Sequence, residues 1–172
     1  MRADDPQLND LLAHTRATWP NLQQQLHRRK LGLAFESLMA WGMVHGLGWE
    51  IVGRDVQIFE GKRTVGALDL VVRDPSGVVT HWELAYKLYL QCEDSREWDS
   101  WLGPGGRDRL GIKLRHMLTH QLPLSSRPEA VEALRPLGVD AIDHRRIMLQ
   151  GSLFTPWGAT AVAPVDGHQP AE

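Results

Sequence analysis

Hydrophobic and polar residues change their spacing several times along the chain, and each change indicates a different structural element. Over residues 21–45 the apolar positions recur at roughly helical spacing, and Gly46 and Gly48 supply a stop. We therefore expect one long amphipathic helix there, either continuous or broken near Gly32. A shorter helix is expected from about Pro6 to just before Pro20, since prolines are tolerated where helices begin or end.

Three strand signals follow in succession, at residues 49–59, 63–73 and 78–90. The segments between them are short and contain glycine, and turns of this length join antiparallel neighbours. The pattern thus predicts a three-stranded antiparallel meander.

Helical spacing returns after a glycine-rich loop at residues 98–106. It predicts a helix over 108–121, which Pro123 should end, and a second helix over 128–137, with Gly138 as its C-cap. A further strand is expected at 145–149.

The order α-β-β-β-α-(α)-β predicts an α/β fold in which helices flank a mixed central sheet. A chain of 172 residues is of single-domain size, so we expect one domain over residues 1–162. The last segment, 163–172, is expected to be a disordered tail.

Composition narrows the classes of function. The apolar and charged fractions, 42% and 23%, are those of an ordinary globular protein. A net charge of −2 provides no global basic field, so any contact with nucleic acid must be local. The polar N-terminus and the lack of a long apolar run predict a cytoplasmic protein without a membrane partner.

Two carboxylates, Asp69 and Glu83, interrupt runs that otherwise read as buried strands. An ionised carboxylate is costly to bury unless it is paired or holds a metal, so two of them in neighbouring strands indicate a site. Residues two apart in a strand share a face, which places Glu83 with His81, Ala85 and Lys87.

With the hairpin in simple register, both carboxylates point the same way. Such a pair suits Mg²⁺ or Mn²⁺, which would polarise a phosphoryl oxygen and lower the pKa of a bound water. Lys87 is placed to hold a water or to neutralise charge on a phosphate. Glu36 falls among the apolar residues of the first long helix. It either joins the site from there or is a solvated helix charge.

The order of these residues resembles the PD-(D/E)XK restriction-endonuclease-like superfamily. The resemblance covers most of residues 22–150. A helix with Glu36 comes first, and a G-x-x-D-L-V motif at 66–71 follows, in which Asp69 is the carboxylate. Glu83 lies on the next strand, and a helix comes after it. It implies an endonuclease-like fold in which Asp69 and Glu83 bind a metal and Glu36 is an accessory carboxylate.

One position departs from the superfamily pattern. That pattern has Glu-x-Lys, whereas Ala85 occupies the lysine position here and the lysine follows at Lys87. Two residues along a strand correspond to roughly 6.6 Å on the same face. The departure brings catalytic competence into question.

Three stretches carry a narrower resemblance: H-W-E-L-A-Y-K at 81–87, W-L-G-P with R-D-R-L within 101–110, and H-Q-L-P-L at 120–124. They are similar to an uncharacterised bacterial domain-of-unknown-function family, number eighteen fifty-three, which is usually placed with that superfamily. Members of this family tend to be longer, so we expect a short member or a chain that lacks a C-terminal portion.

The glycine-rich loop at 103–106 leads through Arg107 and Arg109 into a helix that carries Lys113. Helix N-termini bind anions, and glycine permits close approach of a phosphate backbone. One interpretation is that these three basic residues contact DNA or RNA beside the metal. The other is a flexible loop with Asp108 near the N-cap and solvated basic residues beyond it.

Other chemistries have weaker support. His116 and His120 have the i, i+4 spacing of two zinc ligands, but Met117 stands where a His-Glu-x-x-His motif needs glutamate. Cys92, the single cysteine, has no evident base and reads as a structural thiol.

The leading hypothesis is therefore a Mg²⁺-dependent nuclease that acts on nucleic acid, DNA before RNA, with a homodimer as a family expectation. The alternative is a catalytically inactive nuclease-like module that binds nucleic acid or a protein. A third possibility is a structural interaction domain, in which Asp69 pairs with an arginine such as Arg54 or Arg73 and Glu83 faces away.

Overall fold

The computed structural model describes residues 30–92 and 97–158. Its first helix, α2 (Leu31–Leu47), ends at Gly48, which adopts the left-handed conformation with φ 68° and donates its backbone N–H to the Val44 carbonyl. The predicted stop is therefore correct at Gly48, whereas Gly46 lies inside the helix. The start of the expected 21–45 helix, the expected 6–20 helix and the 163–172 tail lie outside the described residues.

The predicted meander is confirmed. Strands β1 (Glu50–Glu60), β2 (Arg63–Arg73) and β3 (Val79–Gln91) pair antiparallel in chain order. The turn after β2 is held by Asp74, whose side chain accepts hydrogen bonds from the backbone N–H groups of Ser76 and Val78.

Strand β3 is the centre of the sheet, because β5 (His144–Phe154) lies parallel along its whole opposite edge. A short strand, β4 (Trp101–Leu102), joins β3 at Leu90 after the 3₁₀ turn η1 (Trp98–Ser100). The prediction that the last strand stops at residue 149 is wrong. Its second half lacks an apolar pattern, but backbone pairing with β3 carries it onward, and Gly151 permits the close approach to the Lys87 carbonyl.

The second helical region is one rod made of α3 (Leu110–His116), the π-helical turn η2 (Met117–Gln121) and α4 (Leu122–Leu124). We predicted that Pro123 would end this helix, and it does not. The backbone N–H of Leu122 bonds to the Met117 carbonyl, five residues back. The widened turn lets the chain pass Pro123, which has no N–H to donate.

The next helix confirms the prediction for residues 128–137. It comprises α5 (Pro128–Leu134) and the 3₁₀ turn η3 (Arg135–Leu137), and Gly138 ends it at φ 72°. In the part of the chain that the structure describes, no helix is long and apolar enough to cross a membrane.

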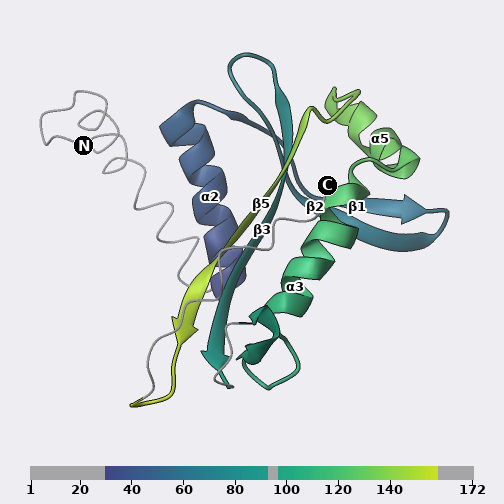
Figure 1. The fold of residues 1–172 in the computed structure, drawn as a ribbon. Helices are drawn as coiled ribbons and strands as arrows, with labels where there is room; N and C mark the ends of the chain where they lie inside the picture. Colours follow the sequence, from purple (N-terminus) through teal and green to yellow (C-terminus); the bar gives the residue numbers. More distant parts are fainter. Residues whose placement is uncertain (1–29, 93–96, 159–172) are drawn as a thin grey trace, which may run out of the picture.

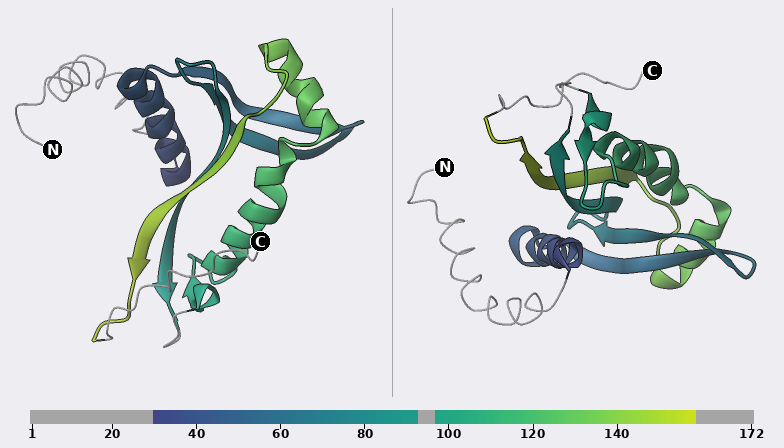
Figure 2. Two further views of the ribbon diagram at one scale, coloured as in Figure 1. Left: turned by 45° about the horizontal axis from the view of Figure 1, so that its top comes forward. Right: turned by 90° about the horizontal axis from the view of Figure 1, so that it is seen from below.

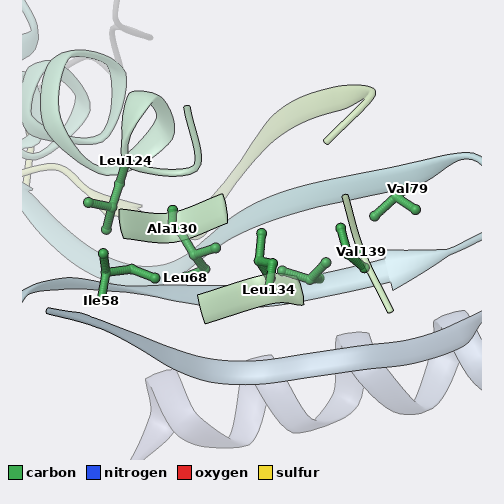
Figure 3. Packing of buried hydrophobic residues seen from close by; sticks show 8 residues of the cluster. Ile58, Leu68, Val79, Leu124, Ala130, Leu134 and Val139 are labelled. Atoms are coloured by element: carbon green, nitrogen blue, oxygen red, sulfur yellow. The ribbon is translucent and has the colours of Figure 1, made fainter. Parts of the chain in front are cut away.

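The elements form three layers, so the predicted mixed α/β fold is confirmed (Figures 1 and 2). Helix α2 covers one face of the sheet, where Ala40 and Met43 pack against Leu70, Val72 and Leu84. The α3–α4 rod and α5 cover the other face. Figure 3 shows the core on that side, built from one buried cluster: Ile58, Leu68, Val71, Val79, Leu124, Ala130, Leu134 and Val139.

Truncation of a leucine in this core tests the packing. Leu134 is 1% exposed, whereas Leu137, three residues further on, is 40% exposed. We expect Leu134→Ala to lower the free energy of unfolding by about 2–4 kcal/mol, because it leaves a cavity. Leu137→Ala is the matched control and should cost well under half as much in urea unfolding; equal costs would contradict this packing.

Candidate functional site

The candidate site lies where β2 leaves β3. Their last paired residues are Leu70 and Trp82, and Asp69 is the next residue along β2. Its Oδ2 accepts a 2.8 Å hydrogen bond from the backbone N–H of Leu84. The carboxylate thus takes the place that a backbone carbonyl would have in a continuing ladder. The two strands diverge beyond this point (Figure 2).

Glu83 lies opposite this opening and is fully buried, with 0% exposure. Its Oε1 lies 2.7 Å from Nε2 of His81, and its Oε2 accepts a 2.7 Å hydrogen bond from Nε2 of Gln121. His81 is in turn 3.0 Å from the Ser125 hydroxyl. As predicted, His81 and Glu83 share one face of β3, and that face meets the α3–α4 rod.

Asp69 and Glu83 come together as the sequence predicts. Burial, and then the charge of Glu83, raise the pKa of Asp69 from 3.8 to about 7, although the Leu84 N–H acts in the opposite direction. Two carboxylates that share a site resist ionising together. One further positive charge, carried by a proton or by a cation, would therefore stabilise the pair.

Glu36 also belongs to this region. It lies on α2, and its charge contributes to the raised pKa of Asp69. The charge of Glu36 therefore acts on the site, as the first of its two interpretations expects, although more weakly than the charge of Glu83.

Lys87 lies on the same face of β3 as Glu83, but its ammonium is engaged elsewhere. Its Nζ forms a 2.6 Å ion pair with Oδ2 of Asp108. Burial and the nearby Asp108 charge raise the pKa of the Tyr89 hydroxyl beside them. Lys87 therefore ties the loop before α3 to the sheet.

Lys113 reaches the carboxylates from the helical layer. Its Nζ donates a 2.8 Å hydrogen bond to Oε1 of Gln121, whose amide group donates to Glu83. Burial, and then the charge of Lys87, lower the pKa of Lys113, whereas Asp69 and Glu83 oppose that shift. Lys113 thus lies within electrostatic reach of both carboxylates.

The π-helical turn explains how Lys113 and Gln121 meet. In an uninterrupted α-helix, residues eight apart are about 80° away from each other around the axis. The turn η2 contains more residues per revolution and takes up this excess. Both side chains therefore project toward β3.

The other predicted phosphate-binding residues lie away from the carboxylates. Arg107 is exposed on the glycine-rich loop. Arg109 donates a 2.6 Å hydrogen bond from Nη1 to the Asp99 carbonyl, so its guanidinium holds the loop. Of the three basic residues, Lys113 is the one that lies at the site.

The arrangement argues against a purely structural arginine pair. Arg73 binds Glu50 at 2.6 Å, and Arg54 donates to the Ser37 hydroxyl. Among the described residues neither arginine forms an ion pair with Asp69, and Glu83 does not face away. The arginine pair expected of a structural interaction domain is therefore not formed by Arg54 or Arg73.

Sequence reasoning assigned no role to His81, Gln121 or Ser125. Strand alternation placed His81 on the face of Glu83, which was a usable signal. Gln121 ends a π turn and Ser125 follows it, and spacing alone does not reveal that turn. Exposed Arg145 adds a 3.0 Å hydrogen bond from Nε to the Ser125 hydroxyl at the end of this polar chain.

Asp69 and Glu83 are the residues that could hold a metal. In the described part of the chain, no group of three or more His, Cys, Asp and Glu side chains is arranged around a common point. Mg²⁺ does not require one, since it commonly binds one or two carboxylates and keeps several waters.

The rings of His116 and His120 stack with centroids 5.0 Å apart on the exposed side of the rod.

The raised pKa of Asp69 predicts a pH-dependent stability. Between pH 4 and 7 the folded protein keeps a proton on Asp69 that the unfolded chain releases, so stability falls as pH rises through about 7. Asp69→Asn should therefore be more stable, relative to the wild type, at pH 8 than at pH 5. Because Asp69 is partly solvated, we expect the difference in free energy of unfolding between variant and wild type to shift by about 1–3 kcal/mol between these pH values in EDTA.

Urea unfolding at both pH values measures this difference, and Asp140→Asn, on the surface, is the control that should show none. An Asp69→Asn effect of the same size at pH 5 and pH 8 would contradict the assignment.

Comparison with known proteins gave one match. Searches of curated proteins and of solved structures found none. The family model described as Domain of unknown function (DUF1853) matches residues 3–171, which is nearly the whole chain and confirms the narrower resemblance. The protein therefore belongs to the DUF1853 family.

Proposed function

We propose that the protein is a metal-dependent phosphodiesterase of the PD-(D/E)XK type that hydrolyses nucleic acid. The observation that carries the proposal is the Asp69–Glu83 pair at the parting of β2 and β3. Burial and repulsion by Glu83 raise the pKa of Asp69 to about 7. The surrounding groups therefore do not fully compensate the negative charge of the two carboxylates.

The donor set suits a hard divalent cation. Asp69 and Glu83 would hold Mg²⁺ or Mn²⁺, which supplies charge to polarise a phosphoryl oxygen and to acidify a water. The Leu84 carbonyl is a further candidate ligand, because the N–H and C=O of one strand residue point to the same edge and this N–H points to Asp69.

The order of the elements supports the same fold type. Helix α2 with Glu36 precedes the β1–β2–β3 meander, and the α3–α4 rod precedes β5, which lies parallel to β3. This order is the one expected of a restriction-endonuclease-like core. Glu36, Asp69 and Glu83 come from α2, β2 and β3 of this arrangement.

The proposed reaction is hydrolysis of a phosphodiester. A water oxygen forms a bond to phosphorus, the bond to the leaving oxygen breaks, the water gives up a proton to solvent, and the leaving oxygen takes one from solvent. Glu83 is held by His81 and Gln121 and therefore keeps one orientation throughout. Asp69 is oriented by the Leu84 N–H in the same way.

Nucleic acid, DNA in the first place, is the proposed substrate. The net charge of −2 does not favour long-range attraction, so the contact must be made locally. Exposed Arg107 on the glycine-rich loop is one such local contact to a phosphate.

Substitution of the two carboxylates tests the assignment. With plasmid DNA and Mg²⁺ or Mn²⁺, we expect the purified protein to nick DNA and both Asp69→Ala and Glu83→Gln to lose at least about 100-fold in rate. Asp140→Asn should cut like the wild type. Carboxylate variants that retain wild-type cleavage would show that another group, or a contaminant, is responsible.

An inactive nuclease-like module is the second candidate function. Two observations favour it: Ala85 occupies the position expected for lysine, and both Glu83 oxygens already have hydrogen-bond partners. In such a module the polar chain would be structural, and nucleic acid or a protein would bind without being cut.

Calorimetric titration with Mn²⁺ separates these two functions. The nuclease should bind the ion with an affinity that falls at least about tenfold in Asp69→Asn, because one ligand charge is lost. Asp140→Asn should bind like the wild type. An inactive module should show no Mn²⁺ binding that depends on Asp69.

A further inference from the structure

We propose that Lys113, from the helical layer, supplies the ammonium that contacts the substrate phosphate, and that Lys87 serves only to anchor the loop before α3. This inference rests on the proposed function and names the group that completes its site. The lysine that contacts the phosphate would then come from α3, which faces the same carboxylates, and not from β3.

Lys87 is already committed to the loop. Its ion pair with Asp108 measures 2.6 Å, and both side chains are about one-third exposed. Asp108 is itself fixed, because its carbonyl accepts a 2.7 Å hydrogen bond from the Gly103 N–H. Arg109 then pairs with Leu102 through an isolated bridge. The Lys87–Asp108 pair thus fastens the closed loop to β3, and Asp108 offsets part of the positive charge of Lys87.

Lys113 has unused hydrogen-bonding capacity. An ammonium offers three donors. Among the described residues Gln121 is its hydrogen-bond acceptor, through Oε1, and no carboxylate forms an ion pair with it. A half-buried cation with donors to spare, close to two carboxylates, is suited to an anionic ligand.

Gln121 fixes the position of this ammonium relative to Glu83. Its carbonyl oxygen accepts from Lys113 and its amide group donates to Glu83, so both amide atoms are used and the two residues are one bridge apart. The π-helical turn between Lys113 and Gln121 aligns them on one side of the rod. Gln121 therefore acts as a positioning residue.

The chemistry follows from this placement. The ammonium would donate hydrogen bonds to a non-bridging phosphate oxygen, whose negative charge grows as the water oxygen bonds to phosphorus. Lys113 would keep its proton throughout. Before substrate binds, the same charge would repel an entering divalent cation. This second effect can be measured without any catalysis.

The test uses two variants of the 172-residue chain. Lys113→Met removes the ammonium while keeping a side chain of similar length. The control, Lys87→Met with Asp108→Asn, removes the other lysine together with its counter-ion and so leaves the net charge unchanged. The Kd for Mn²⁺ is measured by calorimetry at pH 8.5, and hydrolysis is measured with bis(p-nitrophenyl) phosphate and Mn²⁺.

We expect Lys113→Met to bind Mn²⁺ at least about threefold more tightly, since a nearby positive charge is gone, and to hydrolyse the diester at least about 50-fold more slowly. The control should stay within about threefold of wild type in both. If Lys113→Met changes neither quantity, or if the control loses the activity, the inference is overturned while the proposed function stands. A wild-type protein that neither binds Mn²⁺ through Asp69 nor cleaves overturns both.

Discussion

The hydrogen bond from the Leu84 N–H to Asp69 is the contact on which the site depends. It is formed at the position where β2 stops pairing with β3, and it satisfies a strand N–H that the ladder no longer reaches. Because β5 continues along the other edge of β3, the sheet stays intact while β2 diverges. The resulting opening gives Asp69 and Glu83 a shared environment between two helical layers.

A polar chain that is buried at Glu83, His81 and Ser125 keeps the second carboxylate in place. It runs from Lys113 through Gln121, Glu83, His81 and Ser125. Buried polar groups are costly when unpaired, so removing one member leaves its neighbours unsatisfied. A network of this kind specifies one orientation for Glu83 and links the helical rod to β3. The same polar chain therefore stabilises the fold and orders the site.

Much of this arrangement could be predicted from the sequence, and the limits have physical causes. Alternation and short turns revealed the meander, and two charges in apolar runs revealed Asp69 and Glu83. Gln121 was missed because a π turn shifts its direction, and spacing rules assume an α-helix. The ion pair of Lys87 was not foreseen, because its partner, Asp108, comes from a loop 21 residues away. Contacts between distant segments leave no periodic signal.

The central claim is that the two carboxylates hold one divalent cation between them. Crystals soaked in Mn²⁺ and measured at an anomalous wavelength test it most directly. The account predicts one strong anomalous peak bound to oxygens of both Asp69 and Glu83, at roughly 2.0–2.3 Å. A well-ordered map with no peak there, or with Lys113 moved into an ion pair with both carboxylates, would contradict it.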